Sequence, residues 1–281
     1  MGQFILTVSC RNTVGIVAAI ATRLATNGGD IRQARQFDDE ETGSFFARIA
    51  FAMPNGTAAF EEGFAADASR FDLKWTLRPS NRKRKVLILV SKFDHCLGDL
   101  LYRMRIGELN MECVGIVSNH PVSALNVTQH HGIPYHHFLI SRETKTEQEE
   151  KIKQVIAETG AELLILARYM QILSDDFSAY LSGRCINIHH SFLPGFKGAK
   201  PYHQAHERGV KMIGATAHYV TEDLDEGPII AQDVEHVTHA DTPDDLVRKG
   251  RDIERRVLAR AVAYHLEDRV LINDRKTVVF A

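Results

Sequence analysis

The sequence has few of the features that mark membrane, disulfide-stabilised and nucleic-acid-binding proteins. No apolar run approaches the roughly 20 residues that a transmembrane helix needs, and the first residues, MGQFILTVSCRN, do not resemble a signal peptide. The four cysteines include no C-x-x-C pair, so neither a disulfide framework nor a zinc ribbon is predicted. A formal net charge of -2 argues against nucleic acid as the main partner. We therefore expect a cytoplasmic protein that binds neither nucleic acid nor a membrane.

Motifs for common cofactors and metals are also missing. The apolar stretch 86–90 is followed by SKFDHCLGDLL, which contains neither G-x-G-x-x-G nor a P-loop. There is no H-E-x-x-H, and no carboxylate is spaced to complete a metal site with His203 and His206. We expect no metal and no tightly bound cofactor.

The order of apolar patterns predicts two domains of different type in these 281 residues. Residues 1–79 read as β-α-β-β-α-β, with strands at 4–10, 30–38, 44–53 and 72–78 and helices at 14–29 and near 58–68, which is a ferredoxin-like order. Residues 80–85 are basic, lack an apolar anchor and are expected to form a linker. Beyond them strands and helices alternate, which predicts a larger, mostly parallel α/β domain over residues 86–281.

The first domain resembles an ACT domain in the loop that follows its first strand. There Arg11-Asn12-Thr13-Val14 precedes Gly15-Ile16-Val17, where the helix begins, whereas ACT domains commonly carry Pro-Asp or Asp-Arg in this loop. The resemblance implies two alternatives: an amino-acid effector bound by Asn12, Thr13, Val14 and Gly15, or association of the chain into a homo-oligomer through this domain. We expect the domain to serve assembly or control, because every catalytic candidate follows the linker.

The strongest signal for chemistry lies between residues 185 and 233. Asn187 and His189 occupy alternate positions of an expected strand, so their side chains share a face, and Asp225 stands shortly before Gly227-Pro228. An amide, an imidazole and a carboxylate together can orient a water, take its proton and stabilise an oxyanion. His189 also lies at the carboxyl end of its strand, where α/β sheets bind ligands. These residues predict acyl transfer to water or to an amine.

The same stretch resembles the superfamily of formyltetrahydrofolate-using transferases and hydrolases. Its signature is Asn-x-His, then a Ser-Leu/Phe-Leu-Pro turn, then an Asp next to Gly-Pro, and all three stand here in order. The resemblance implies that Asn187, His189 and Asp225 are catalytic and that 10-formyltetrahydrofolate is the substrate. ARYMQILSDDF (167–177) resembles the segment that forms the pterin slot. By this resemblance, the residues that bind the folate are Met170, Gln171, Ile172, Leu173, Thr221, Glu222 and Leu224.

The loop after the first strand of the larger domain favours water as the formyl acceptor. Glycinamide-ribonucleotide transferases of the superfamily have a Gly-Asn-Gly-Ser-Asn-like loop there, whereas this chain has Ser91-Lys92-Phe93-Asp94-His95. Phe93 and Asp94 are larger than the residues they replace, and the added negative charge should repel a phosphate.

An ACT-like domain followed by this catalytic domain is the architecture of the formyltetrahydrofolate deformylases. That resemblance implies hydrolysis of 10-formyltetrahydrofolate to formate and tetrahydrofolate, in support of one-carbon balance and purine synthesis. Two alternatives remain: a formyltransferase with another amine acceptor, and a non-catalytic folate or amino-acid sensor.

Overall fold

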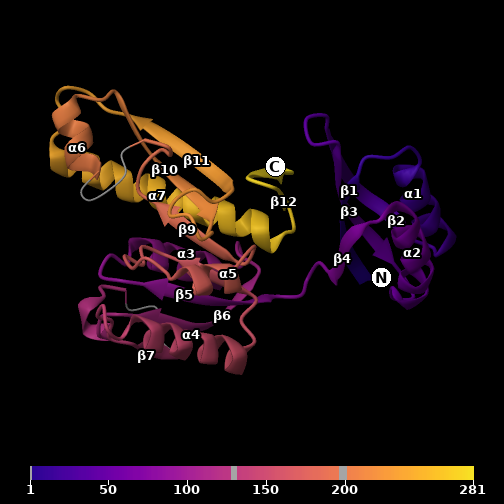
Figure 1. Cartoon of the computed structure of the whole chain (residues 1–281), viewed down its shortest axis with the longest axis horizontal. Coiled ribbons are helices and arrows are strands. Elements are labelled where there is room, and N and C mark those ends of the chain that lie inside the picture. Colours follow the sequence, from indigo (N-terminus) through magenta and orange to yellow (C-terminus); the bar gives the residue numbers. More distant parts are fainter. Residues whose placement is uncertain (1, 128–131, 196–200) are drawn as a thin grey trace. The chain divides into compact units, whose positions relative to one another are not determined.

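The computed structural model of the chain describes residues 2–127, 132–195 and 201–281. The chain divides into two compact units: unit 1 comprises Met1–Arg82 and Glu267–Ala281, and unit 2 comprises Lys83–Leu266. Unit 1 contains β1 (Gly2–Arg11), α1 (Ile16–Thr26), β2 (Asp30–Asp39), β3 (Ser44–Met53), α2 (Ala58–Phe71), β4 (Lys74–Pro79), β12 (Val270–Asn273) and β13 (Lys276–Val279) (Figure 1).

The main sheet of unit 1 confirms the ferredoxin-like prediction. Its strands lie in the antiparallel order β2-β3-β1-β4, with α1 and α2 in the crossovers. Helix α1 buries Ile16, Ile20 and Leu24, which recur every four residues along one face, and these pack with Phe60 and Phe64 of α2 in a single core.

The last fifteen residues were expected in the larger domain, but they belong to unit 1. Arg48 donates from Nε to the carbonyl oxygen of Glu267 over 2.9 Å, and Arg78 forms an ion pair with Asp268. Asn273 donates a hydrogen bond to Asp39. These contacts join polar residues that are far apart in the chain. The periodicity of apolar residues therefore could not predict that the last residues belong to unit 1.

The expected linker 80–85 is also shorter in the structure. Arg84 and Lys85 already belong to a parallel strand, where they pair with Met111 and Glu112. Their charged side chains concealed the strand, because a ladder is built from backbone groups and tolerates polar side chains at its exposed end. Only residues 80–83 connect β4 to the next strand.

Unit 2 confirms the prediction of a mostly parallel α/β domain. Its seven strands lie in the order β11-β10-β9-β8-β5-β6-β7, parallel from β9 to β7, with β10 and β11 antiparallel. The elements are β5 (Arg84–Val90), α3 (His95–Arg105), β6 (Met111–Ser118), η1 (Val122–Ala124), β7 (Tyr135–His137), α4 (Lys145–Thr159), β8 (Leu163–Leu166), α5 (Asp175–Tyr180), β9 (Cys185–His189), α6 (Pro201–Arg208), β10 (Met212–Tyr219), β11 (Ile229–His236) and α7 (Pro243–Leu266).

Both faces of the central strands are buried. Leu87 and Leu89 of β5 pack with Ile152 and Ile156 of α4 and with Phe177 of α5. The alternate residues of β5 point to the other face and are equally buried. Helix α7 packs along β9, β10 and β11 and against α3 (Figure 1). The carboxyl ends of β5, β8 and β9 are thereby held side by side in a rigid frame.

Two further expectations can be checked on the described residues. None of their helices combines the length and the apolar character needed to cross a bilayer. All four cysteines are free, and Cys96, Cys113 and Cys185 are buried.

Candidate active site

A cavity of about 580 Å³ opens at the carboxyl ends of β8 and β9. Its volume is in the range that binds cofactor-sized ligands. All ten residues assigned to catalysis or folate binding line it: Met170, Gln171, Ile172, Leu173, Asn187, His189, Thr221, Glu222, Leu224 and Asp225.

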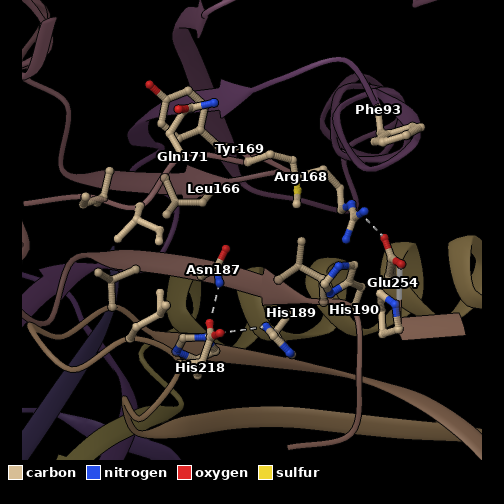
Figure 2. A pocket seen from close by; sticks show the side chains of 18 of the residues that line it. Phe93, Leu166, Arg168, Tyr169, Gln171, Asn187, His189, His190, His218 and Glu254 are labelled. Carbon is tan, nitrogen blue, oxygen red and sulfur yellow. Dashed lines mark hydrogen bonds and ion pairs between the residues drawn. The ribbon is translucent and has the colours of Figure 1, made fainter. Parts of the chain in front are cut away.

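Strand β9 presents Asn187 and His189 on one face, as their spacing predicted. In the antiparallel pair with β10, Asn187 lies opposite His218 and His189 lies opposite Thr216. The Nδ1 atom of His189 is 3.2 Å from Oδ2 of Asp225, and Figure 2 shows Asn187 and His189 pointing toward the same space. The structure thus brings together three groups that are up to 38 residues apart in the sequence.

The loop between β10 and β11 sets the position of Asp225. Asp225 itself has a φ of 59°, a left-handed conformation that is uncommon for residues other than glycine. Two residues later, a Cβ on Gly227 would lie 1.8 Å from the carbonyl oxygen of Tyr219, so only glycine fits. The backbone N–H of Tyr219 donates to the carbonyl of Pro228 over 2.9 Å and closes the loop.

The carboxyl of Asp225 is held in its ionised form. Burial raises its pKa, but hydrogen bonds from His189 and His218 outweigh burial and hold the pKa well below its ordinary value. The carboxylate therefore keeps a negative charge beside Nδ1 of His189.

His218 belongs to this group, although the sequence analysis did not select it. Its Nδ1 lies 2.8 Å from the carbonyl oxygen of Tyr219, which can only accept, so Nδ1 carries a proton. Its Nε2 lies 3.3 Å from Nδ2 of Asn187 and 3.6 Å from Oδ1 of Asp225. The signal in the sequence was a histidine in the otherwise mostly apolar strand GATAHYV.

The turn that follows His189 is fixed by a buried hydroxyl. Thr216 accepts a hydrogen bond from the backbone N–H of Leu193 and donates one to the carbonyl of Ser191, each over 3.0 Å. The Ser-Phe-Leu-Pro turn is therefore anchored to β10, next to the carboxyl end of β9.

The residues of the expected pterin slot form apolar walls that are open to solvent. Met170, Ile172 and Leu224 are 51%, 62% and 56% exposed, although they line a cavity. The backbone N–H of Met170 donates to Oγ of Ser91 over 3.0 Å, which fixes the start of this segment. Exposed apolar side chains around a concave site are typical of ligand-binding surfaces.

A second group of polar side chains in the cavity was also missed. Arg168 and Glu254 form an ion pair with Nε 3.4 Å from Oε2. Glu254 also accepts hydrogen bonds from Nε2 of His95 over 2.9 Å and from the hydroxyl of Tyr202 over 2.7 Å. The Arg168 guanidinium lies 5.7 Å from the centroid of the Phe93 ring. Glu254 lies on α7, a helix that we did not expect from the sequence.

Among the described residues, one group has donor atoms close enough together to hold a metal ion: His95, Cys96 and Glu254, with ligand atoms within 4.8 Å of one another. The chemistry of the donors fits a metal poorly. Burial and the charge of Glu254 raise the pKa of the Cys96 thiol well above its ordinary value, so the thiol stays protonated. The carboxylate of Glu254 already faces the positive charge of Arg168.

The residues assigned to an effector lie in unit 1, in the loop between β1 and α1. The N–H of Asn12 donates to the carbonyl of Gly43 over 2.8 Å, and Gly15 has a φ of 99° at the start of the helix. Val14 is 98% exposed. The loop therefore presents an apolar side chain and free surface beside a helix N-terminus.

Comparisons with known proteins agree with this geometry. The family described as "Formyl transferase" matches residues 84–262. A formyltetrahydrofolate deformylase of Corynebacterium sp. (strain P-1) is 50% identical over 280 residues, which cover 99% of this chain and 98% of that protein. The crystal structure of a formyltetrahydrofolate deformylase from Burkholderia mallei is 51% identical, with a TM-score of 0.95 and full coverage of both chains. The structure of glycinamide ribonucleotide transformylase 1 from Symbiobacterium toebii is 29% identical, with a TM-score of 0.65, and covers 71% of this chain and 95% of that one.

Proposed function

The chain belongs to the formyltetrahydrofolate deformylases, and we propose that Asn187, His189 and Asp225 carry out its reaction. That reaction is the hydrolysis of 10-formyltetrahydrofolate to formate and tetrahydrofolate. The observation that supports the assignment best is the contact between His189 and Asp225, 3.2 Å long, at the wall of the cavity that Asn187 also lines.

Water attacks the formyl carbon, and its proton passes to His189. A carboxyl whose pKa is held so low is a weak base, so Asp225 acts through its neighbour: it orients the imidazole and stabilises the charge that forms there. Nδ1 of His189 faces Asp225, and Nε2 is buried and has no hydrogen-bond partner among the residues that the structure describes. That free nitrogen is the atom available to a water or to the substrate.

The protonated His189 and the amide of Asn187 then donate hydrogen bonds to the oxyanion of the tetrahedral intermediate. The bond from carbon to N10 of the folate breaks, N10 takes the proton that His189 received from the water, and the formyl group leaves as formic acid, which ionises to formate. An oxyanion donor is typically worth about 10²–10³-fold in kcat, and general acid–base help about 10²–10⁴-fold. These contributions suffice for a hydrolase that uses no metal.

The folate binds with its pterin between two apolar walls. Met170, Ile172 and Leu173 form one wall, and Leu224 with the loop from Thr221 and Glu222 forms the other, while backbone groups at Gln171 and Leu173 bond the ring edge. The support is the exposure of these apolar side chains around the cavity. A flat heterocycle between these walls would bury apolar surface that is otherwise exposed.

An assay of formate release, with and without added amines, tests this function. We expect formate and tetrahydrofolate in equal amounts from 10-formyltetrahydrofolate, at a rate that amines do not change. Transfer of the formyl group to an amine would instead support the transferase, and tight folate binding without turnover would support the sensor.

We expect the replacement of His218 by leucine to raise the pKa of Asp225, so that the loss of kcat/KM caused by protonation of this carboxylate begins at a higher pH. Hydrogen bonds from His189 and His218 lower the pKa of Asp225, so the loss of one raises that pKa and the active carboxylate is protonated at a higher pH. His218→Gln keeps a donor and should show a smaller shift. A uniform loss of activity with an unchanged profile would assign His218 to packing alone.

Chelators are expected to leave the activity unchanged, and the purified protein should carry no stoichiometric metal. The donors near Glu254 are a protonated thiol and a carboxylate that is already paired with Arg168. Dialysis against a chelator, followed by metal analysis and the formate assay, checks this expectation. A bound metal whose removal and return track with activity would contradict it.

Unit 1 joins copies of the chain. Its loop also binds an amino-acid effector, for which the ACT resemblance suggests glycine or methionine; the residues of this loop are Asn12, Thr13, Val14 and Gly15. Strand β2 is an edge strand of ten residues that is exposed along nearly its whole length, including Phe37 at 46%. Such an edge is a site of association unless it is covered.

We place the enzyme in the cytoplasm, because free, buried thiols are usual in a reducing compartment.

We therefore expect Phe37→Asp to reduce the size of the particle in sedimentation experiments while kcat stays within a few-fold of the parent value. A charge at the exposed edge is costly to bury against a second copy. Phe37→Tyr retains the ring and serves as the control. An unchanged particle size for the aspartate variant would locate the assembly surface elsewhere.

A further inference from the structure

Arg168 occupies a backbone conformation that does not favour arginine. It follows β8 directly and has a φ of 63°, in the left-handed region that glycine adopts freely and other residues adopt at a cost. Its side chain is nevertheless 91% covered and points into the cavity of the active site (Figure 2). Residues held in such conformations cluster at functional sites, where the surrounding structure maintains them.

Glu254, the partner of Arg168, is also fixed by several contacts. Glu254 is 1% exposed and is bonded by His95 and Tyr202 as well as by Arg168. Burial raises its pKa, but the His95 hydrogen bond and the Arg168 charge outweigh burial, so the pKa lies below the ordinary value and the group is charged. The Tyr202 ring lies so close to Gly250 that a Cβ there would be 2.1 Å from it. The whole cluster is thus packed onto α7.

A buried ion cluster is weak evidence for a role in stability, because the cost of desolvating the charges can exceed their attraction. Its position is more informative. In Figure 2, Gln171 and Tyr169 lie on one side of Asn187 and His189, whereas Phe93, Arg168 and Glu254 lie on the other. With the pterin between its proposed walls, this other side is the part of the cavity that remains for the acceptor. Phe93 and His95 belong to the loop that has small residues in the amine-using transferases of the superfamily.

The same side retains buried polar nitrogens that make no hydrogen bond to any described residue. They are His190 Nδ1 and Arg168 Nε, the latter in an ion pair with Glu254 at 3.4 Å. Burial and the charge of Arg168 lower the pKa of His190 to about 4, so its imidazole is neutral at physiological pH. Buried polar groups of this kind are commonly satisfied by ordered water. The space left by the cluster is therefore polar and suited to water.

We propose that Arg168, with Glu254, Phe93 and His95, closes the acceptor side of the active site to amines and so makes water the formyl acceptor. This inference rests on the proposed function and adds the residues that select the acceptor. An amine that did enter would form an N–C bond to the formyl carbon as the bond from carbon to N10 breaks. The amine would lose a proton and N10 would gain one, so the transfer needs no further reactant.

The test is the partition of the formyl group between water and glycinamide in the full-length protein. Glycine suits the backbone at residue 168, so Arg168→Gly should fold. It should raise the ratio of N-formylglycinamide to formate at least about ten-fold over the parent protein, the lower range of discrimination by pocket space. Phe93→Ala, at a residue that is 45% exposed, should change the ratio in the same direction. Mass spectrometry measures the amide, and an enzyme-free sample gives the background.

Arg248→Ala removes an exposed arginine of α7 that does not line the cavity and should leave the ratio unchanged. The inference is overturned if folded, hydrolysing Arg168→Gly and Phe93→Ala proteins keep the parental ratio, or if Arg248→Ala raises it equally. A folded Arg168→Gly protein that makes neither product would also overturn it, because Arg168 would then serve hydrolysis itself. Failure of the parent protein to release formate would instead reject the proposed function.

Discussion

Asp225→Asn should lower kcat by about 10²–10⁴-fold while the protein still folds. Asparagine keeps the shape of the side chain, but it carries no charge to stabilise a protonated His189, whose Nδ1 lies 3.2 Å from the carboxylate. Single-turnover measurement of formate release gives the effect on the chemical step. Asp252→Asn, at an exposed residue of α7, is the matched control. Activity within a few-fold of the parent would remove Asp225 from the mechanism.

The same substitution should also affect stability, with a definite dependence on pH. The pKa of Asp225 is depressed in the folded state, so its ionisation stabilises the fold above the pKa of the unfolded chain, and this contribution is lost as the pH falls. The asparagine variant should therefore be less stable than the parent at neutral pH and approach it in acid. Thermal unfolding at several pH values separates this effect from the loss of catalysis.

Asn187→Ala should reduce kcat by about 10²–10³-fold. His189→Ala should reduce it by at least about 10²–10⁴-fold, because His189 also takes the proton of the water. Both changes should raise KM much less. Both side chains donate to an oxyanion that exists only in the transition state and the intermediate, so ground-state binding of the folate is largely preserved. The pterin walls are untouched by either change. A loss confined to KM would mean that these residues bind substrate and do not promote the reaction.

The double variant tests whether the two residues act as a unit. If they do, the double variant should lose less kcat than the product of the two single losses. The first substitution already weakens the stabilisation of the oxyanion to which the second residue contributes. Kinetic measurements on all four proteins complete the cycle. Losses that multiply strictly would show that Asn187 and His189 act independently.

Much of the fold could be predicted from the sequence, because its signals are local. The alternation of Asn187 and His189 placed both on one face of a strand, and the apolar run Val86–Val90 indicated a strand covered on both sides. The β-α-β-β-α-β order of unit 1 followed from periodicity and turns. The family motif linked Asp225 to Asn187 and His189, which lie 38 and 36 positions earlier.

The rest of the site could not be predicted, because it depends on pairing and backbone geometry. His218 faces Asn187 only through the register of β9 and β10, which the sequence does not specify. The left-handed backbone at Arg168 leaves no mark in residue type. Glu254 lies in a helix whose many charged residues hide its buried face, although its place among Ile253, Val257 and Leu258 at helical spacing was a usable signal.

The return of Glu267–Ala281 to unit 1 has a consequence for how the protein is made. In topological terms unit 2 is an insertion within unit 1, because the chain leaves unit 1 after Arg82 and comes back to it at Glu267. On the ribosome, β1 to β4 are made before the last residues of unit 1. Arg48 and Arg78 can contact Glu267 and Asp268 only after some 185 further residues have been translated. The first-made part of the enzyme is thus completed last, after the part that bears the cavity has already had time to fold.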